Sequence, residues 1–452
     1  PRQELDQAGL VAAVGHSSPQ DSVERPPRPR SRRASHHVLS NGLTVRCEPD
    51  ESAELVGISL MGLGGSLAEG TRMPGLGQAW SACLSRGAGG LGPLEFAAEV
   101  EERAGAMQSW TGRNTMGIQL SFPRSELGTA MELLSLLIFD PAFDPIEVER
   151  IRLDLLQAQQ SVLDDPDQLS WDLTWAGLFP GHPWGRSSVG TPASMSRLTT
   201  GRIRAYHRRV LQGSNLVLGV SGAVDPEQIN QLAERRLGRL RGGRRFPLSP
   251  PVERIRFRAR PRRRFSRDGA PASLVLGFPC PGCDQEGGVT ATVLAALLGG
   301  ASGGAGRLFD SLREVQGLAY SVGASAELGL GAGAVICSMS TDPERLDQAK
   351  MGLWSELDRL CRDGVSSDEL DRVRNSLVDG SVLGLQRASA RADYLAAAEL
   401  YGEPGGDYRA MLERPRDVQQ EDVERMARSI LRRDRSCETV VSPLMGSNSW
   451  LD

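Results

Sequence analysis

The sequence predicts an α+β protein of two tandem homologous domains, each a mostly antiparallel sheet with helices packed on it. The chain has 452 residues, which is too long for a single hydrophobic core. Strand-like and helix-like segments follow one another in a certain order, and that order then occurs a second time. The repeat is visible in the residues, since 100–112 (VEERAGAMQSWTG) corresponds to 312–324 (LREVQGLAYSVGA), and 144–156 corresponds to 366–378.

The first copy is expected at residues 37–237, after a basic, proline-rich segment, 1–36, that we expect to be a disordered arm. Its strands are apolar or alternating runs bounded by turn residues, and they are expected at 38–46 around an Asn41-Gly42 turn, 56–63, 107–122 around a turn at 112–114, and 215–221. Its helices have apolar residues at three- and four-residue steps, and they are expected at 75–86, 94–105, 127–139, 145–163, 198–210 and 226–237.

The second copy is expected at residues 268–445, after an Arg- and Pro-rich linker at 238–267 that has no periodicity. Strands are expected at 272–278 and between 318 and about 341, and helices at 289–298, 343–362 and 368–385. The glycines at 329, 331 and 333 fall between strands and indicate a hairpin turn.

The composition excludes several classes of protein. Hydrophobic residues make up 40%, charged residues 24%, and the net charge is −4, so we expect no nucleic-acid partner. No run of about 18 apolar residues occurs, so no membrane span is predicted. No signal peptide is recognisable, and we expect a cytoplasmic location, or a periplasmic one if a signal precedes this chain. Seven cysteines indicate no disulfide framework; Cys280 and Cys283 are expected in a turn, as free thiols or as a local disulfide.

Residues 298–320 combine a glycine-rich loop with a helix and the start of a strand. The loop glycines, where the backbone can approach a partner closely, are Gly299, Gly300, Gly303, Gly304 and Gly306. The helix carries Arg313, and Tyr320 follows just past its end. A guanidinium and a phenol on adjoining elements can both donate hydrogen bonds to one carbonyl oxygen. The alternative is an arginine at a helix end and a tyrosine in the core.

This pattern resembles the pitrilysin/insulinase family of zinc metallopeptidases, in particular its smaller, processing-peptidase-like branch, over residues 38 to about 440. Gly65-Ser-Leu-Ala-Glu69 and the helix after it match the frame in which that family carries the inverted zinc motif H-x-x-E-H. Gln78 and Ala82 stand at the two histidine positions, and Ser81 stands at the position of the general base. With Glu149 as the anchor, Leu156 stands at the third ligand position. The resemblance therefore implies a degenerate site that binds no metal.

The sequence of the second copy retains another feature of that family, an arginine and a tyrosine seven residues apart. Residues 307–322 match the segment in which an arginine and a tyrosine close over the bound peptide and hold its backbone carbonyl. The resemblance implies that role for Arg313 and Tyr320, and it implies that the loop from Gly299 to Gly306 lies beside the substrate chamber.

The leading hypothesis is the non-zinc-binding subunit of a heterodimeric zinc endopeptidase. This chain would hold no cofactor, zinc would be bound by a homologous partner with H-x-x-E-H, and the substrate would be an unfolded peptide taken up by edge strands. The alternative is a catalytically inactive scaffold or peptide-binding module, like core subunits of respiratory complexes. A hydrolase with an unrelated site has little support, because neither a G-x-S-x-G elbow nor a phosphate-binding G-x-x-x-x-G-K-[ST] loop occurs.

Overall fold

Two β-sheets and the helices packed on them make up the described structure. The computed structural model describes residues 34–247, 262–265, 270–301 and 306–443. Most of the expected arm (1–33) and two of the loop glycines, Gly303 and Gly304, lie outside the described residues. Residues 34–247 are called the N-terminal half below, and the described residues from 262 onward are called the C-terminal half.

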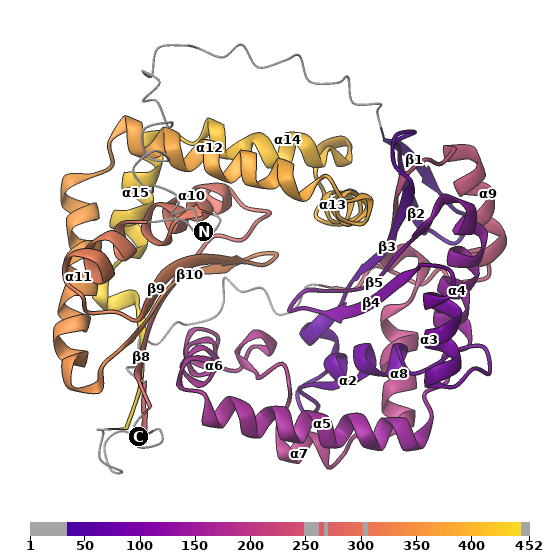
Figure 1. Ribbon diagram of the computed structural model, residues 1–452, viewed down its shortest axis with the longest axis horizontal. Helices are drawn as coiled ribbons and strands as arrows, with labels where there is room; N and C mark the ends of the chain where they lie inside the picture. Colours follow the sequence, from indigo (N-terminus) through magenta and orange to yellow (C-terminus); the bar gives the residue numbers. More distant parts are fainter. Residues whose placement is uncertain (1–33, 248–261, 266–269, 302–305, 444–452) are drawn as a thin grey trace, which may run out of the picture. The chain divides into compact units, whose positions relative to one another are not determined.

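Figure 1 labels the elements of both halves. The strands are β1 (Ser35–Val38), β2 (Thr44–Pro49), β3 (Leu55–Leu63), β4 (Ala106–Thr111), β5 (Thr115–Pro123), β6 (Leu216–Gly222), β7 (Arg262–Phe265), β8 (Ala272–Cys280), β9 (Ser321–Leu328), β10 (Gly333–Thr341) and β11 (Cys437–Ser442). The helices of the N-terminal half are α2 (Leu76–Leu84), α3 (Pro93–Glu101), α4 (Leu127–Phe139), α5 (Pro145–Asp164), α6 (Pro166–Leu178), α7 (Pro192–Met195), α8 (Thr200–Val210) and α9 (Pro226–Leu237). Those of the C-terminal half are α10 (Gly288–Gly299), a π-helical segment η7 (Phe309–Val315), α11 (Leu346–Asp363), α12 (Ser367–Gly384), α13 (Ala388–Leu400), α14 (Tyr408–Glu413) and α15 (Gln420–Ile430).

The two sheets share one strand order, which is the structural mark of a duplication. The orders are β1-β2-β6-β3-β5-β4 and β7-β11-β8-β10-β9. When β1 is set aside, the two orders correspond strand for strand. Directions correspond as well, because β2 runs parallel to β6 and β7 runs parallel to β11, whereas the other neighbours are antiparallel. The predicted fold class is therefore confirmed.

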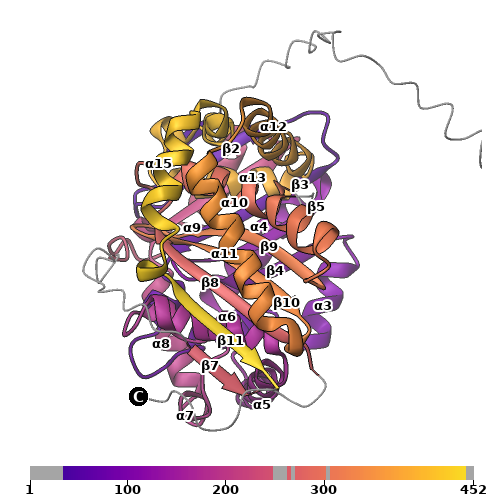
Figure 2. The same cartoon turned by 90° about the vertical axis from the view of Figure 1, so that its left-hand side faces the viewer.

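Each sheet has its own helices on one face and a helix from the other half on the opposite face. In the N-terminal half α2, α4 and α9 pack on their own sheet. In the C-terminal half α10, α11 and α15 do so, and Figure 2 is seen from the side of these helices. Helix α13 of the C-terminal half packs on β3 and β6, and α6 of the N-terminal half packs on β8 and β11. The two halves thus exchange one helix each.

The alternation of side chains along the central strands produces this arrangement. Successive residues of a strand point to opposite faces of the sheet. In β8, Leu274 and Leu276 join the core beneath the sheet's own helices, whereas Val275 joins a cluster with Trp175 and Leu178 of α6. Both faces are buried, so the strand is a continuous apolar run rather than an alternating one.

Glycines in the central strands allow the exchanged helix to come close. A Cβ atom on Gly219 of β6 would lie 2.1 Å from the carbonyl oxygen of Ala392, and one on Gly57 of β3 would lie 2.3 Å from the backbone nitrogen of Ser389. Both distances are far shorter than van der Waals contact, so any side chain at these positions would push α13 away from the sheet.

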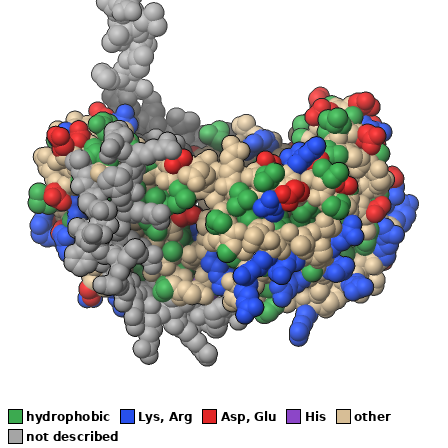
Figure 3. Space-filling view, turned by 90° about the horizontal axis from the view of Figure 1, so that it is seen from below, with side chains coloured by type: hydrophobic (Ala, Val, Ile, Leu, Met, Phe, Trp, Pro, Cys, Tyr) green, Lys and Arg blue, Asp and Glu red, His purple; other side chains and the backbone are tan. Residues whose placement is uncertain are grey.

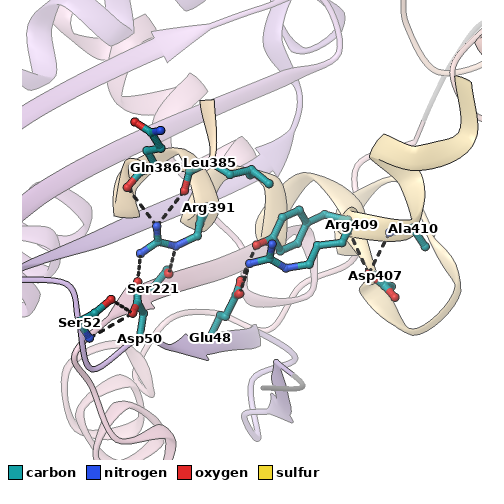
Figure 4. Close-up of polar contacts among 11 residues, drawn as sticks. Glu48, Asp50, Ser52, Ser221, Leu385, Gln386, Arg391, Asp407, Arg409 and Ala410 are labelled. Carbon is teal, nitrogen blue, oxygen red and sulfur yellow. Dashed lines mark hydrogen bonds and ion pairs between the residues drawn. The ribbon is translucent and has the colours of Figure 1, made fainter. Parts of the chain in front are cut away.

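A buried polar network also joins the halves (Figure 4). The Arg391 guanidinium on α13 donates to Asp50 at 2.8 Å and to the Ser221 hydroxyl at 2.9 Å, both in the N-terminal half. The Tyr408 hydroxyl of α14 donates to Glu48 on β2 at 2.6 Å. Removing one member of such a network leaves its buried partners unpaired, which costs more than the net contribution of the bonds.

Most predicted elements agree with the structure; for example, the helices expected at 127–139 and 226–237 are α4 and α9. The predicted hairpin turn is confirmed by the hydrogen bond from the Gly329 N–H to the Ala332 carbonyl (2.9 Å), and Cys280 and Cys283 are free thiols. Helices α6 and α13 were not predicted, and β7 lies inside the segment expected to be a linker. None of the helices in the described ranges is long and apolar enough to cross a membrane.

Candidate functional site

Helix α2 begins at a buried carboxylate. Glu69 accepts hydrogen bonds from the N–H groups of Gly75 (3.1 Å) and Gly77 (3.0 Å). The N-cap residue of α2 is Gly75, which has φ 85° and no side chain to cap the helix. Glu69 therefore accepts the hydrogen bonds that an N-cap side chain would otherwise accept from the first backbone N–H groups. Burial raises the pKa of Glu69 to about 8, although both hydrogen bonds and the nearby Arg186 lower it.

Helices α2 and α5 pack against each other and carry the four positions that the resemblance compares with a zinc site. Ala82 and Leu156 are partly buried and contact the apolar core of the N-terminal half. Ser81 is buried, and its carbonyl oxygen accepts a hydrogen bond from the Ser109 hydroxyl on β4 at 2.7 Å. Gln78 is partly exposed. These positions therefore serve helix packing and a helix-to-strand contact.

The side chains at these positions do not fit a zinc ion. Zinc in proteins is bound by thiolate, imidazole and carboxylate groups. The alkyl groups of Ala82 and Leu156 have no lone pair to donate, and the neutral amide of Gln78 is a poor ligand. Across the described ranges, no group of three or more His, Cys, Asp or Glu side chains is placed to hold a metal ion. No metal-dependent step is therefore derived from this chain's own residues.

His182, in the turn after α6, has a structural environment. The ring is buried, and its Nδ1 accepts a hydrogen bond from the Trp184 N–H at 3.2 Å. His182 therefore stabilises the turn by accepting a hydrogen bond from its backbone.

Arg313 and Tyr320 lie on the surface on either side of a tight turn. Arg313 is exposed on η7, where its guanidinium lies 5.1 Å from the centre of the Phe309 ring. The Tyr320 side chain is 62% exposed, immediately before β9, and its N–H donates to the Ser340 carbonyl at 2.8 Å. In the described part of the chain, neither side chain forms a hydrogen bond or an ion pair, so both keep their donors available.

Buried contacts on the same segment hold these two side chains outward. Leu308, Leu312 and Leu318 are buried in the core of the C-terminal half. Arg307 makes a two-pronged ion pair with Glu369 of α12, with both contacts at 2.6 Å. Because these residues fix the inner side of the segment, Arg313 and Tyr320 occupy its outer side.

The described loop glycines allow close backbone approach. A Cβ atom on Gly299 would lie 2.1 Å from the backbone nitrogen of Ala324 in β9, and one on Gly306 would lie 2.2 Å from the backbone nitrogen of Gly300. The two ends of the loop therefore pack against the edge strand of the C-terminal sheet and against each other. A role of this loop in substrate binding stays a prediction.

Two edge strands lie beside these positions. Among the described strands, β4 ends the N-terminal sheet and β9 ends the C-terminal sheet. Helix α2 packs on β4, and η7 packs on β9. The four positions that the resemblance compares with a zinc site and the Arg313/Tyr320 pair are thus each next to an edge strand, which is where an extended peptide can add.

Two family models match this chain in succession. The insulinase (peptidase family M16) model matches residues 44–191, and the model of the peptidase M16 inactive domain matches residues 197–377. An uncharacterized zinc protease of Mycobacterium tuberculosis (strain H37Rv) is 30% identical over 407 residues, covering 88% of this chain and 90% of that protein. The uncharacterized zinc protease YmxG of Bacillus subtilis (strain 168) is 22% identical over 356 residues, covering 78% and 85%.

Solved structures show the same fold. A peptidase M16 inactive domain from Pseudomonas fluorescens superimposes with a TM-score of 0.82 at 18% identity, covering 92% of this chain and 99% of that one. A chain of Complex III2 from Candida albicans superimposes with a TM-score of 0.76 at 18% identity, covering 91% and 97%. Fold and sequence together define a two-domain protein with metallopeptidase architecture. The chain belongs to the insulinase family, peptidase family M16.

Proposed function

We propose that this chain is the zinc-less subunit of a heterodimeric endopeptidase, and that its partner is a homologous subunit that carries H-x-x-E-H. The observation that carries the proposal is a contrast within one chain. The four positions on α2 and α5 offer no metal ligand, whereas Arg313 and Tyr320 are exposed and free to donate hydrogen bonds.

The chemistry of the pair suits a peptide amide. The guanidinium of Arg313 and the hydroxyl of Tyr320 both donate, and neither needs to give up a partner in order to bind a carbonyl oxygen. The same donors would stabilise the negative charge that develops on that oxygen when the amide is attacked. Edge strands β4 and β9 would hold the peptide in an extended form by main-chain hydrogen bonds. The likeness to proteins named zinc proteases supports peptides as the substrate class.

The test uses the complex of this chain with a homologous H-x-x-E-H subunit from the same organism. We expect the complex to cleave an unstructured peptide and this chain alone to be inactive. Arg313→Ala and Tyr320→Phe should each lower kcat/KM of the complex by about 10²-fold, the effect typical of a lost oxyanion donor. The control is Arg372→Ala on α12, which removes an exposed arginine and should leave kcat/KM within about twofold.

Three outcomes would contradict the proposal in different ways. Unchanged cleavage by both variants would remove the role of Arg313 and Tyr320 while leaving the heterodimer intact. A stable complex with no peptidase activity and no affinity for peptide would instead favour the alternative, an inactive scaffold. Zinc measured in this chain alone by elemental analysis would contradict the assignment of the metal to the partner.

A further inference from the structure

A pocket in the N-terminal half has a lining rich in arginine. It has a volume of about 440 Å³ and lies between the end of α4, helix α8 and the segment after α9. That volume falls in the range of small-ligand pockets, about 300–1,000 Å³. The pocket shares no residue with the positions discussed above. Its basic side chains are Arg204, Arg208, Arg239 and Arg241.

Among the described residues these arginines have no carboxylate partner. In the described part of the chain none of the four forms an ion pair, whereas Arg236, three residues before Arg239, pairs with Glu132 at 3.0 Å. Asp140 is the one acidic residue in the pocket lining. The lining therefore contains four arginines and one aspartate, an excess of three positive charges, although the whole chain carries a net charge of −4.

His207 at the base of the pocket adds no charge at neutral pH. The Trp80 indole N–H donates to its Nδ1 at 3.0 Å, so the proton of the ring is on Nε2, which lies 2.8 Å from the Ile138 carbonyl oxygen. Burial lowers the pKa of His207 to about 4. The positive charge of the pocket therefore comes from guanidinium groups, which stay protonated throughout the working pH range.

Two of the arginines share one helix face and a third is held by an aromatic ring. Arg204 and Arg208 are four residues apart on α8, so both side chains point from the same side of that helix. The Arg239 guanidinium lies 4.1 Å from the centre of the Phe139 ring. A planar cation held in this way loses less conformational freedom when it binds an anion.

The segment that carries Arg239 and Arg241 is fastened to its neighbours. The Asn41 side chain donates to the carbonyls of Leu237 (2.9 Å) and Gly238 (3.2 Å), and the Gly213 N–H donates to the Arg241 carbonyl (2.8 Å). The backbone around the pocket is therefore fixed before any ligand arrives.

We propose that this pocket binds a compact organic anion with at least two negative charges, carried as phosphate or carboxylate groups, and an apolar body. Guanidinium forks match the geometry of both groups. The apolar part would contact the aromatic and aliphatic lining, Phe139, Phe143, Leu211 and Leu240. Basic side chains also gather on the face of the molecule seen from below (Figure 3). Because such a basic surface attracts anions without a defined site, the test must separate the pocket from its surroundings.

The test is isothermal titration of the full chain with inorganic pyrophosphate, and separately with citrate. We expect saturable one-to-one binding of at least one probe, and the probe with the lower Kd shows whether the pocket prefers phosphate or carboxylate groups. The double variants Arg204→Gln/Arg208→Gln and Arg239→Gln/Arg241→Gln should each raise Kd at least about tenfold. The control, Arg197→Gln/Arg202→Gln, removes two exposed arginines near and on α8 that do not line the pocket, and Kd should change less than about twofold.

Three results would overturn the proposal. They are no saturable binding of either probe, an equal loss of binding in the control variant, and binding only to phosphatidylglycerol vesicles, which would indicate a membrane surface rather than a pocket. All substituted arginines are exposed, so the variants are expected to fold, and circular dichroism checks this. The result does not depend on whether the chain takes part in peptide cleavage.

Discussion

At the scale of single residues, the local sequence reveals some features of the candidate sites, and others become visible only through tertiary contacts. The absence of strong metal ligands at Gln78, Ala82 and Leu156 is readable from the sequence, because each of these residue types excludes strong metal binding. The burial of Glu69 is not readable, since Glu is usually exposed and its partners are backbone N–H groups. The arginine pocket was also missed, because its members come from separate elements that only the fold brings together.

The buried Glu69 predicts an unusual dependence of stability on pH. Its pKa is about 8 in the folded chain against an ordinary value of 4.5, so between these values the folded state binds a proton that the unfolded state has lost. The free energy of unfolding therefore falls as pH rises through this window. From pH 6.5, the ordinary pKa of histidine, to pH 8, Glu69 should contribute a fall of about 2 kcal/mol.

Urea denaturation at pH 6.5, 7.25 and 8 measures this fall. Glu69→Gln, which cannot ionise, should remove most of it. Glu101→Gln at an exposed position of α3 should behave as the wild type. A wild-type chain whose stability is flat over this range would show that Glu69 is ionised in the folded state.

At the scale of elements, most helices that pack within their own half were predicted, although α15 was not, and neither of the two exchanged helices was predicted. The helix at 127–139 shows its period because it covers its own sheet on one side. Helices α6 and α13 contact a sheet from the other half, and α13 is rich in alanine on several faces, so the sequence shows little contrast between an inner and an outer side. Strand β7 (RRRF) has no apolar alternation, and it pairs in parallel with β11, which lies far away in the sequence. No local pattern therefore predicted it.

The contact between α2 and α5 predicts that a metal site can be restored. Histidines at 78 and 82 would be four residues apart on one helix face, and a glutamate at 156 would come from the helix packed beside it. The variant Gln78→His/Ala82→His/Leu156→Glu should contain about one zinc ion per chain by elemental analysis, and the wild type none. Zinc in the wild-type chain would overturn the assignment of these positions.

A matched control places the glutamate at a more exposed position of the same helix. Gln78→His/Ala82→His/Leu153→Glu uses a position whose side chain is 52% exposed, so the carboxylate should not reach the histidines. Equal zinc contents in the two variants would show that α5 does not supply the third position.

At the scale of the whole molecule, duplication and exchange act together. The internal repeat was visible in the sequence, because residues 100–112 correspond to 312–324 and residues 144–156 correspond to 366–378. The exchange of α6 and α13 was not visible. The close approach of α13, for example, depends on Gly57 and Gly219, which read simply as small residues in apolar strands. Contacts between the halves were therefore the part of the fold that was hardest to predict from the sequence.

The close approach at Gly219 predicts a large effect from one methyl group. Gly219→Ala would place a carbon against the backbone of α13 and should lower the free energy of unfolding by about 1–3 kcal/mol. Urea denaturation measures the change. Gly384→Ala, at the end of α12 with no atom near the added carbon, should be neutral or slightly stabilising. Equal stabilities of the two variants would mean that α13 can move away without cost.

The exchange of helices also limits how such a protein can be divided or evolve. A fragment ending near residue 247 would keep α6 without the sheet it covers, and would expose the face of its own sheet on which α13 packs. The matching fragment would have the opposite defects. Each fragment alone would expose an apolar sheet face and an uncovered helix. These surfaces are complementary, so two separately produced fragments would need each other to complete the fold. Recombination within the family is therefore expected to swap both halves as one inherited block.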